Sequence, residues 1–245
     1  MRMTRFHCPD VSAIGQQIAL PAQAAHHASR VLRMSAGDEL QLFNGLGREF
    51  SAKILRMTKS EVVAVTMADI ANDVESNLRV VLAQGISSGE RMDFTLQKAV
   101  ELGVTGIQPI SAERSVVRLS GERQEKRRQH WQSVVISACE QCGRSFVPQV
   151  ADVMGLPEWL ASYATPGIRL VLSPAAEHGL REMTRPTETD SITLLVGPEG
   201  GLSESEIKAA YQAKFQAMRL GSRILRTETA ALAALAALQT LWGDF

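Results

Sequence analysis

The chain has 245 residues, enough for one large domain or two, and 45% of them are hydrophobic, so it can bury a substantial core. Lysine plus arginine and aspartate plus glutamate each number 26, so net charge alone indicates no class of partner. No N-terminal segment has the apolar form of a secretory signal, and the longest apolar run, residues 230–238, is far shorter than the ~20 residues of a membrane span. These features predict a soluble, cytoplasmic protein.

The cysteines do not predict a metal or disulfide framework. Cys139 and Cys142 form a C-x-x-C pair, a spacing found in zinc and redox sites. A zinc site needs further ligands, and Cys8, His26 and His27 do not provide them at a suitable spacing. The pair also lies in a helical pattern, where positions i and i+3 share one face. We therefore interpret the two cysteines as small apolar helix residues and predict no metal.

The N-terminal part of the chain is predicted to form a small barrel. Residues 21–34 begin with a proline and carry apolar residues at helical spacing, which predicts a helix. Residues 38–45, 48–57 and 61–67 alternate or are rich in β-branched and aromatic side chains, which predicts three strands. The stretch 71–77 is polar and marks a boundary. We therefore predict two domains, 1–72 and 77–245.

From residue 78 onwards, apolar strands alternate with amphipathic helices. Strands are predicted at 78–86, 104–110, 167–173, 191–197 and 216–221, and helices at 91–103, 121–145, 155–163, 203–215 and 227–242. This alternation is typical of a mostly parallel α/β sheet.

A glycine-rich turn follows the strand at 191–197. Residues 197–201 read GPEGG, which fits neither the phosphate-binding GxxxxGK[ST] pattern nor the dinucleotide-binding GxGxxG pattern. Glu199 would repel a polyphosphate, whereas a neutral or cationic ligand would be accepted. The alternative is a tight strand-to-helix connection with no ligand. In either case, Ser203 and Glu206 have the spacing of a capping box.

A second glycine loop repeats this arrangement. At 219–235 a strand end is followed by Gly221, a short loop and a helix, with Thr227 expected as the N-cap and Glu228 in the first turn. Residues 170–179 provide a third strand end. Because open α/β sheets bind ligands at the carboxyl ends of their strands, these loops predict a ligand site.

The two glycine segments carry a specific resemblance. GPEGGLSESEI at 197–207, followed by LGSRILRTETAALAAL at 220–235, resembles the SPOUT superfamily of knotted methyltransferases. The similarity is greater to its RsmE-type members, which methylate N3 of a uridine in 16S ribosomal RNA of the small subunit. Segments 26–50, 98–104, 113–117 and 138–148 fit the same family, so the resemblance extends over the whole chain.

The resemblance implies the fold and the ligand. It implies an α/β, SPOUT-type trefoil-knotted parallel-sheet domain preceded by a PUA-like β-barrel domain, and S-adenosylmethionine bound in the knotted loops. That ligand carries a sulfonium and an amino group and no phosphate, which agrees with Glu199 in the turn. The positions expected to bind the cofactor are Leu172, Ser173, Leu195, Val196, Gly197, Pro198, Gly200, Gly201, Leu220, Gly221, Ile224, Leu225 and Thr227.

Basic residues gather in two segments that we expect to contact ribosomal RNA. Between residues 113 and 130, six basic residues stand with three acidic ones, and the N-terminal 33 residues are also basic. The RNA-binding candidates are Arg2, Arg5, Arg30, Arg33, Arg114, Arg118 and Arg127. The alternative is that these charges form solvated helix faces.

Methylation of N3 requires loss of the imide proton and stabilisation of negative charge on the flanking carbonyl oxygens. Arg226 and Arg144 are the candidates for stabilising this charge, and Glu199 or Glu228 for accepting the proton. Two other functions stay open at this point. One is an RNA-binding ribosome-assembly factor without activity, and the other is a SPOUT enzyme with another target, such as a ribose 2′-oxygen.

The C-terminal helix lacks a polar face over residues 230–238, AALAALAAL. A helix packed on one side of a sheet needs only one apolar stripe, so this helix is expected to be covered on further sides. SPOUT enzymes dimerise through helices beside the knot, and we therefore predict a homodimer, with Ala234 and Leu238 in its interface. The alternative cover is the long helix of the same chain.

Overall fold

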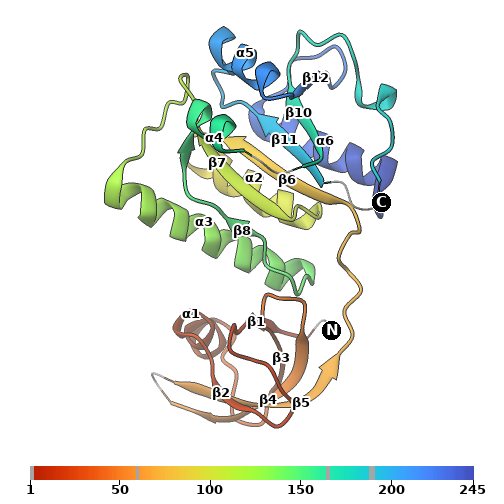
Figure 1. The fold of residues 1–245 in the computed structure, drawn as a ribbon. Coiled ribbons are helices and arrows are strands. Elements are labelled where there is room, and N and C mark those ends of the chain that lie inside the picture. Colours follow the sequence, from red (N-terminus) through yellow and green to blue (C-terminus); the bar gives the residue numbers. More distant parts are fainter. Residues whose placement is uncertain (1–2, 59–60, 164–165, 188–190) are drawn as a thin grey trace. The chain divides into compact units, whose positions relative to one another are not determined.

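The computed structural model describes residues 3–58, 61–163, 166–187 and 191–245 (Figure 1). The chain forms two compact units. The first comprises Met1–Glu75 and Ile136–Val147, and the second Ser76–Val135 and Pro148–Phe245. The boundary between the units after Glu75 falls within the polar stretch 71–77. The predicted domains, 1–72 and 77–245, assign residues 136–147 to the second domain, whereas the structure places them in the first unit. Among the described residues, no helix is long and apolar enough to cross a membrane.

The first unit is built on a five-stranded sheet with the order β1-β3-β4-β5-β2. The strands are β1 (Arg5–His7), β2 (Gln17–Ala19), β3 (Glu39–Phe43), β4 (Glu49–Met57) and β5 (Val62–Ile70). Strands β3, β4 and β5 are antiparallel neighbours, and they are the three strands that the sequence predicts. β1 pairs parallel with β3, and β2 pairs antiparallel with β5. Neither was predicted, because three residues are too few to show a period.

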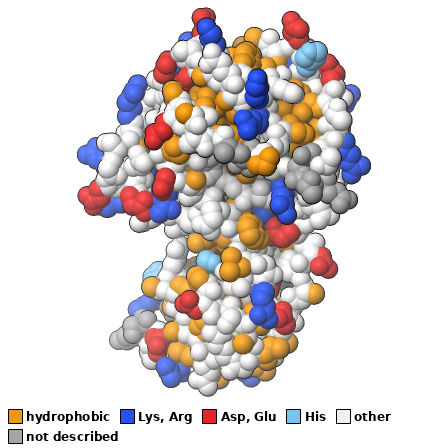
Figure 2. Space-filling model, viewed as in Figure 1, with side chains coloured by type: hydrophobic (Ala, Val, Ile, Leu, Met, Phe, Trp, Pro, Cys, Tyr) orange, Lys and Arg blue, Asp and Glu red, His pale blue; other side chains and the backbone are white. Residues whose placement is uncertain are grey.

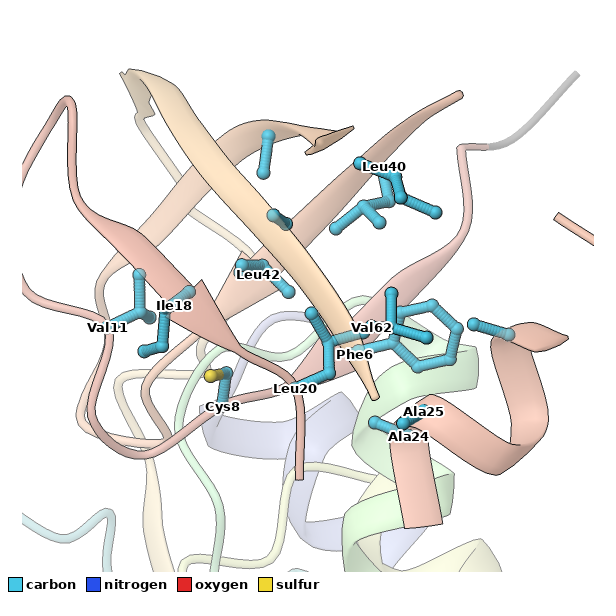
Figure 3. Packing of buried hydrophobic residues seen from close by; sticks show 14 of the residues in the cluster. Phe6, Cys8, Val11, Ile18, Leu20, Ala24, Ala25, Leu40, Leu42 and Val62 are labelled. Atoms are coloured by element: carbon cyan, nitrogen blue, oxygen red, sulfur yellow. The ribbon is translucent and has the colours of Figure 1, made fainter. Parts of the chain in front are cut away.

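The core of the first unit lies between this sheet and a short helix. α1 (Ala22–His26) continues directly into a π-helical turn, η1 (His27–Val31), where the sequence predicts one helix over 21–34. Figure 3 shows Ala24 and Ala25 of α1 in one apolar cluster with Phe6 of β1 and Leu42 of β3. His27 packs edge-on against Phe6 with ring centroids 5.8 Å apart, so it is a packing residue, as the sequence suggests.

A buried ion pair fixes the returning segment in the first unit. Arg5 binds both carboxylate oxygens of Glu49 at 2.8 and 2.9 Å, and it also donates to the backbone carbonyls of Cys139 and Arg144. The hydroxyl of Ser145 donates to Glu49 at 2.6 Å. Burial raises the pKa of Glu49, but these hydrogen bonds lower it by more, so the pKa lies below its ordinary value.

The second unit contains a parallel sheet with the order β12-β10-β11-β6-β7-β8, and β9 also pairs with β7. Its strands are β6 (Arg79–Gly85), β7 (Gly106–Ser111), β8 (Gln149–Val150), β9 (Met154–Gly155), β10 (Ile168–Leu172), β11 (Ser191–Val196) and β12 (Gln216–Met218). The five longer strands confirm the predicted alternation. The chain runs outward from β6 to β8 and then crosses to the other side of β6, which creates a topological switch point beside β11.

Helices cover both faces of this sheet (Figure 1). They are α2 (Glu90–Glu101), α3 (Gly121–Cys142), α4 (Leu156–Ser162), α5 (Glu204–Gln212) and α6 (Thr227–Trp242), and a short 3₁₀ turn, η2, spans Leu180–Glu182. Trp159 of α4 and Ala210 of α5 share a core cluster with Leu195 of β11. The alternate residue Leu194 is also fully buried and points to the opposite face, where α6 packs on β6 and β11 and against α2.

α6 buries one stripe against its own chain. Ala231, Ala234, Leu235 and Leu238 are all 0% exposed, with the i, i+3, i+4, i+7 spacing of a single helix face. The prediction that Ala234 and Leu238 lie in a dimer interface is therefore wrong, because both side chains face the core of their own unit. The helix that packs against α6 is α2, not the long helix that the sequence offered as the alternative cover.

Candidate active site

Loops after four parallel strands meet at the carboxyl edge of the second sheet, where open α/β sheets bind ligands. A cavity of about 480 Å³ lies there, lined by the loops after β10, β11 and β12. This volume lies within the ~300–1,000 Å³ of small-molecule sites. Among the described residues, no group of His, Cys, Asp and Glu side chains could hold a metal ion.

The glycine turn after β11 forms one wall of the cavity. Gly201 has φ +69°, a conformation that L residues rarely adopt, and its N–H donates to the carbonyl of Pro198 at 2.8 Å. The turn passes very close to the end of β6, because a Cβ on Gly85 would lie 2.4 Å from the Pro198 nitrogen. After the turn, the predicted capping box of Ser203 and Glu206 starts α5.

Glu199 is held in this wall by three donors. The N–H and hydroxyl of Ser88 each donate to Glu199 Oε1 at 2.9 Å, and Arg91 Nη1 donates to the same oxygen at 3.2 Å. Burial raises the pKa of Glu199, but these bonds lower it by more, so its pKa lies below the ordinary value. Its other oxygen, Oε2, is buried and has no hydrogen-bond partner among the described residues. This wall of the cavity therefore carries a carboxylate that is paired with Arg91.

The loop after β12 and the start of α6 form the opposite wall. The N-cap of α6 is Arg226, with no side-chain capping bond, so the prediction that Thr227 caps the helix is wrong. The Thr227 hydroxyl instead donates to the carbonyl of Gly197 at 2.6 Å and accepts from Gln84 Nε2 at 2.9 Å. Thr227 therefore links the glycine turn, β6 and α6.

Most of the predicted cofactor positions line this one cavity. They are Leu172, Ser173, Val196, Gly197, Pro198, Gly201, Leu220, Gly221, Ile224, Leu225 and Thr227. Leu195 does not line it and belongs to the apolar core beneath α5. Gly200 does not line it either, and a Cβ there would lie 2.9 Å from Arg114 Cβ.

The three predicted catalytic residues are placed differently. Arg226 and Glu199 both line the cavity. Arg144 belongs to the first unit, where it is 4% exposed and binds Glu75 at 2.7 and 2.9 Å. The placement of Arg144 is that of a structural ion pair, so we do not retain it as a catalytic candidate.

Several residues at the cavity were missed by the sequence reasoning. They are Arg91, Arg219 and Arg223, which line the cavity, and Ser88, which holds Glu199. Only their positions at or just after the ends of predicted strands, or at the start of a predicted helix, could have drawn attention to these four residues. Glu228, which the sequence offers as a proton acceptor, also lines the cavity, and its Oε2 atom is buried without a partner among the described residues, like that of Glu199.

The predicted RNA-binding arginines also divide into two groups. Arg30, Arg33, Arg114, Arg118 and Arg127 are exposed. Arg5 is 7% exposed and fully engaged with Glu49 and two carbonyls, so it cannot serve RNA binding in this conformation, and Arg2 lies outside the described residues. On the face drawn in Figure 2, Lys and Arg side chains are scattered among Asp and Glu rather than gathered in one field.

Two family models match the chain. The one described as "RNA methyltransferase domain" matches residues 74–239, and the one described as "RNA methyltransferase PUA domain" matches residues 20–67. Both agree with the predicted architecture of a SPOUT-type parallel-sheet domain after a PUA-like domain.

Several relatives and solved structures match the chain along nearly its whole length. The ribosomal RNA small subunit methyltransferase E of Buchnera aphidicola is 35% identical over 243 residues, or 99% of this chain and 98% of that protein. The crystal structure of the enzyme of this name from Neisseria gonorrhoeae, bound to S-adenosyl methionine, is 45% identical, with a TM-score of 0.92 over 100% of both chains. A methyltransferase from Legionella pneumophila in complex with the same cofactor is 38% identical, with a TM-score of 0.95 over 100% of both chains. This chain therefore belongs to the ribosomal RNA small subunit methyltransferase E family.

Proposed function

We propose that the protein transfers a methyl group from S-adenosylmethionine to N3 of a uridine in the 16S RNA of the small ribosomal subunit. The observation that carries this proposal is the cavity at the carboxyl edge of the second sheet, in a chain that matches cofactor-bound relatives over its full length. Cytoplasmic location follows from the same substrate and is part of the proposal.

The cavity offers two carboxylates, Glu199 and Glu228, to a cationic cofactor, and four arginines also line it. S-adenosylmethionine supplies an electrophilic methyl group on a positively charged sulfur and carries an amino group. Glu199 and Glu228 both line this site, and each has one carboxylate oxygen that is buried without a hydrogen-bond partner among the described residues. A cation bound in the cavity would be stabilised electrostatically by both carboxylates. The glycines of the turn have no side chains, so the backbone there can come close to the polar edge of an adenine.

Arg226, Glu199 and Glu228 have different roles in the proposed reaction. The exposed Arg226 guanidinium lines the cavity at the N-terminus of α6, where the helix dipole also favours negative charge. It is placed to stabilise the charge that develops on the uracil carbonyl oxygens when N3 loses its proton. Glu199 is a weak base because its pKa is lowered, so we assign it to the cofactor's positive charge. Glu228 is then the carboxylate that accepts the N3 proton.

The test is methyl transfer to undermethylated small subunits with labelled cofactor, followed by nucleoside analysis of the RNA. We expect 3-methyluridine, and reverse transcriptase should stall at the modified base because its pairing face is blocked. A methylated ribose would instead assign the enzyme to another target. Cofactor binding without transfer would favour an assembly factor. Activity should persist in the presence of a chelator, once RNA folding is controlled.

A second copy of the chain is also part of the proposal. The side of α6 away from its buried stripe leaves Ala233 and Ala237 partly exposed and Leu241 41% exposed, and family members with this fold dimerise beside the knot. We expect Ala233→Glu/Ala237→Glu to sediment as a monomer with an unchanged melting temperature, whereas Gln212→Glu on α5 stays dimeric. A wild-type protein that is active as a monomer at micromolar concentration contradicts this part of the proposal.

A further inference from the structure

The loop of residues 112–118, which follows β7, begins with a hydrogen-bonded turn. Ser115 is 6% exposed, and its hydroxyl accepts a hydrogen bond from the Ala112 N–H, while its own N–H donates to the Ala112 carbonyl at 3.0 Å. These bonds form a closed turn inside the loop. The hydrogen bonds therefore fix the loop from Ala112 to Ser115, and Val116 follows directly.

A buried carboxylate fastens this loop to the glycine turn of the cofactor cavity. Glu206 is 2% exposed, and its Oε1 accepts from the Glu113 N–H at 2.9 Å while its Oε2 accepts from the Ser203 N–H at 2.9 Å. The Ser205 hydroxyl adds a bond to Glu113 Oε1 at 3.2 Å. Glu206 thus binds the 112–118 loop as well as the N-cap of its own helix, Ser203, which follows the glycine turn, and a capping box alone does not require this second bond.

The backbones of the two loops also touch. Gly200 lies between Glu199 and Gly201, which both line the cavity, and a Cβ on Gly200 would meet Arg114 Cβ at 2.9 Å and Arg114 O at 3.0 Å. Arg114 Nη1 donates to the Gly200 carbonyl at 3.4 Å. The glycine at position 200 is therefore explained by the approach of the 112–118 loop, not by cofactor contact.

Towards solvent, the 112–118 loop presents one apolar side chain between two cations. Val116 is 74% exposed, and Arg114 and Arg118, two positions to either side, are exposed as well. The only carboxylate of the loop, Glu113, accepts from Ser205. An apolar surface flanked by positive charges complements a single strand of nucleic acid, whose bases are apolar on their faces and whose backbone is anionic.

Resting on the proposed function, we infer that the 112–118 loop is the contact surface for the unpaired RNA next to the target uridine. Val116 packs against a base, Arg114 and Arg118 bind the adjacent phosphates, and Glu206 is the positioning residue that keeps this surface in register with the cofactor turn. An unpaired segment is required, because N3 of a paired uridine is not accessible.

The test compares Val116→Ser with Val74→Ser, a matched control whose side chain is 50% exposed and lies outside both segments expected to contact RNA. KM for undermethylated subunits, kcat, and the Kd of the cofactor by calorimetry are measured for each. We expect Val116→Ser to raise KM for RNA about five- to tenfold without changing cofactor Kd, and Val74→Ser to change neither. Equal KM values for the two variants overturn the inference. So does a change of sedimentation in Val116→Ser alone, which would make the surface an interface between copies.

A double-mutant cycle isolates the role of Glu206. If Glu206 positions the loop, Glu206→Gln raises KM for RNA about tenfold, and adding Val116→Ser to it raises KM by less than about twofold more. Multiplicative effects would show that Val116 acts without Glu206 and overturn the positioning role. Wild-type protein that methylates no subunit RNA removes the proposed function and this inference with it, whereas active wild type with a silent Val116→Ser removes this inference alone.

Discussion

The arginines of the two units are used in opposite ways. In the first unit, Arg5 and Arg144 are almost fully buried, and each forms two hydrogen bonds with a carboxylate. At the cavity of the second unit, Arg219, Arg223 and Arg226 are exposed. A buried arginine deprived of its acid is strongly destabilising, whereas an exposed one contributes little to folding.

The local sequence does not reveal the role of an arginine. Arg226 stands in a segment that resembles an RNA-modifying family and Arg5 in the basic N-terminal segment, and both were predicted to serve function. Only the position of the partner carboxylate separates them, and for Arg5 that partner is Glu49, 44 positions away. Substitution of the buried arginines should nevertheless alter stability, whereas substitution of the exposed arginines at the cavity should alter activity.

The largest effect is expected from Arg5→Met. It leaves Glu49 buried and unpaired, which should lower the free energy of unfolding of the first unit by ~3–5 kcal/mol. All three tryptophans, Trp131, Trp159 and Trp242, belong to the second unit. Denaturant unfolding should therefore show an early transition by far-UV circular dichroism that tryptophan fluorescence does not report.

The control for this prediction is Arg48→Met, whose exposed ion pair with Asp69 is worth only ~0–1 kcal/mol. Equal shifts for the two variants would contradict the buried role of Arg5.

The dependence of stability on pH provides a second test of this ion pair. Because the folded pKa of Glu49 is lowered, its stabilisation is present above the unfolded value of ~4.3 and is lost as the pH falls through the folded value. Glu49→Gln should flatten this acid dependence.

Arg226→Ala should have the next largest effect, on rate rather than on stability. Removing a group that stabilises charge in the transition state lowers kcat by about 10²–10³, and a surface substitution should change stability by less than about 0.5 kcal/mol. Arg226→Lys should recover part of the rate, since it keeps the charge. If the cofactor Kd rises by the same factor as kcat falls, Arg226 is a cofactor ligand instead.

The sequence predicts the second unit well because its elements are long and periodic. β6 and β11 are continuous apolar runs, the helices end at glycines or begin at caps, and the Ser203–Glu206 capping box is a purely local feature. Cofactor positions predicted from the two glycine loops converge on one cavity because parallel strands bring their carboxyl ends to one edge.

What the sequence could not predict depends on contacts between distant segments. The return of residues 136–147 to the first unit rests on Arg5, and the need for glycine at 85 and 200 rests on the close approach of Pro198 and Arg114. The strands β1, β2, β8 and β9 are too short to show a period. The trefoil knot is a property of the whole chain path, so it stays a prediction from the resemblance.

Thr227→Val tests whether the polar link between the two cavity walls matters. It removes the donor to the Gly197 carbonyl and leaves Gln84 Nε2 with one acceptor fewer, at a cost of ~1–3 kcal/mol. Because the glycine turn is a cavity wall, we expect cofactor affinity to fall about tenfold, measured by calorimetry. Thr227→Ser keeps the hydroxyl and should bind nearly as wild type does. Equal affinities for Val and Ser would show that the hydroxyl does not set the turn.

The smallest effect, on RNA binding, is expected from substitutions on α3, where the neighbouring residues Arg127 and Arg128 can be compared directly. Arg128 binds Glu125 and lies 3.3 Å from Asp152, whereas no ion pair is recorded for the exposed Arg127 among the described residues. A phosphate would have to compete with two carboxylates for Arg128, but not for Arg127. Arg127→Gln should therefore weaken RNA binding a few-fold and reduce the slope of log K against log salt by about 0.7–0.9, with no change in stability. Arg128→Gln should leave the slope unchanged. If both variants keep the wild-type slope, the charges of this helix are a solvated face, and RNA contacts of the second unit are confined to the loops around the cavity.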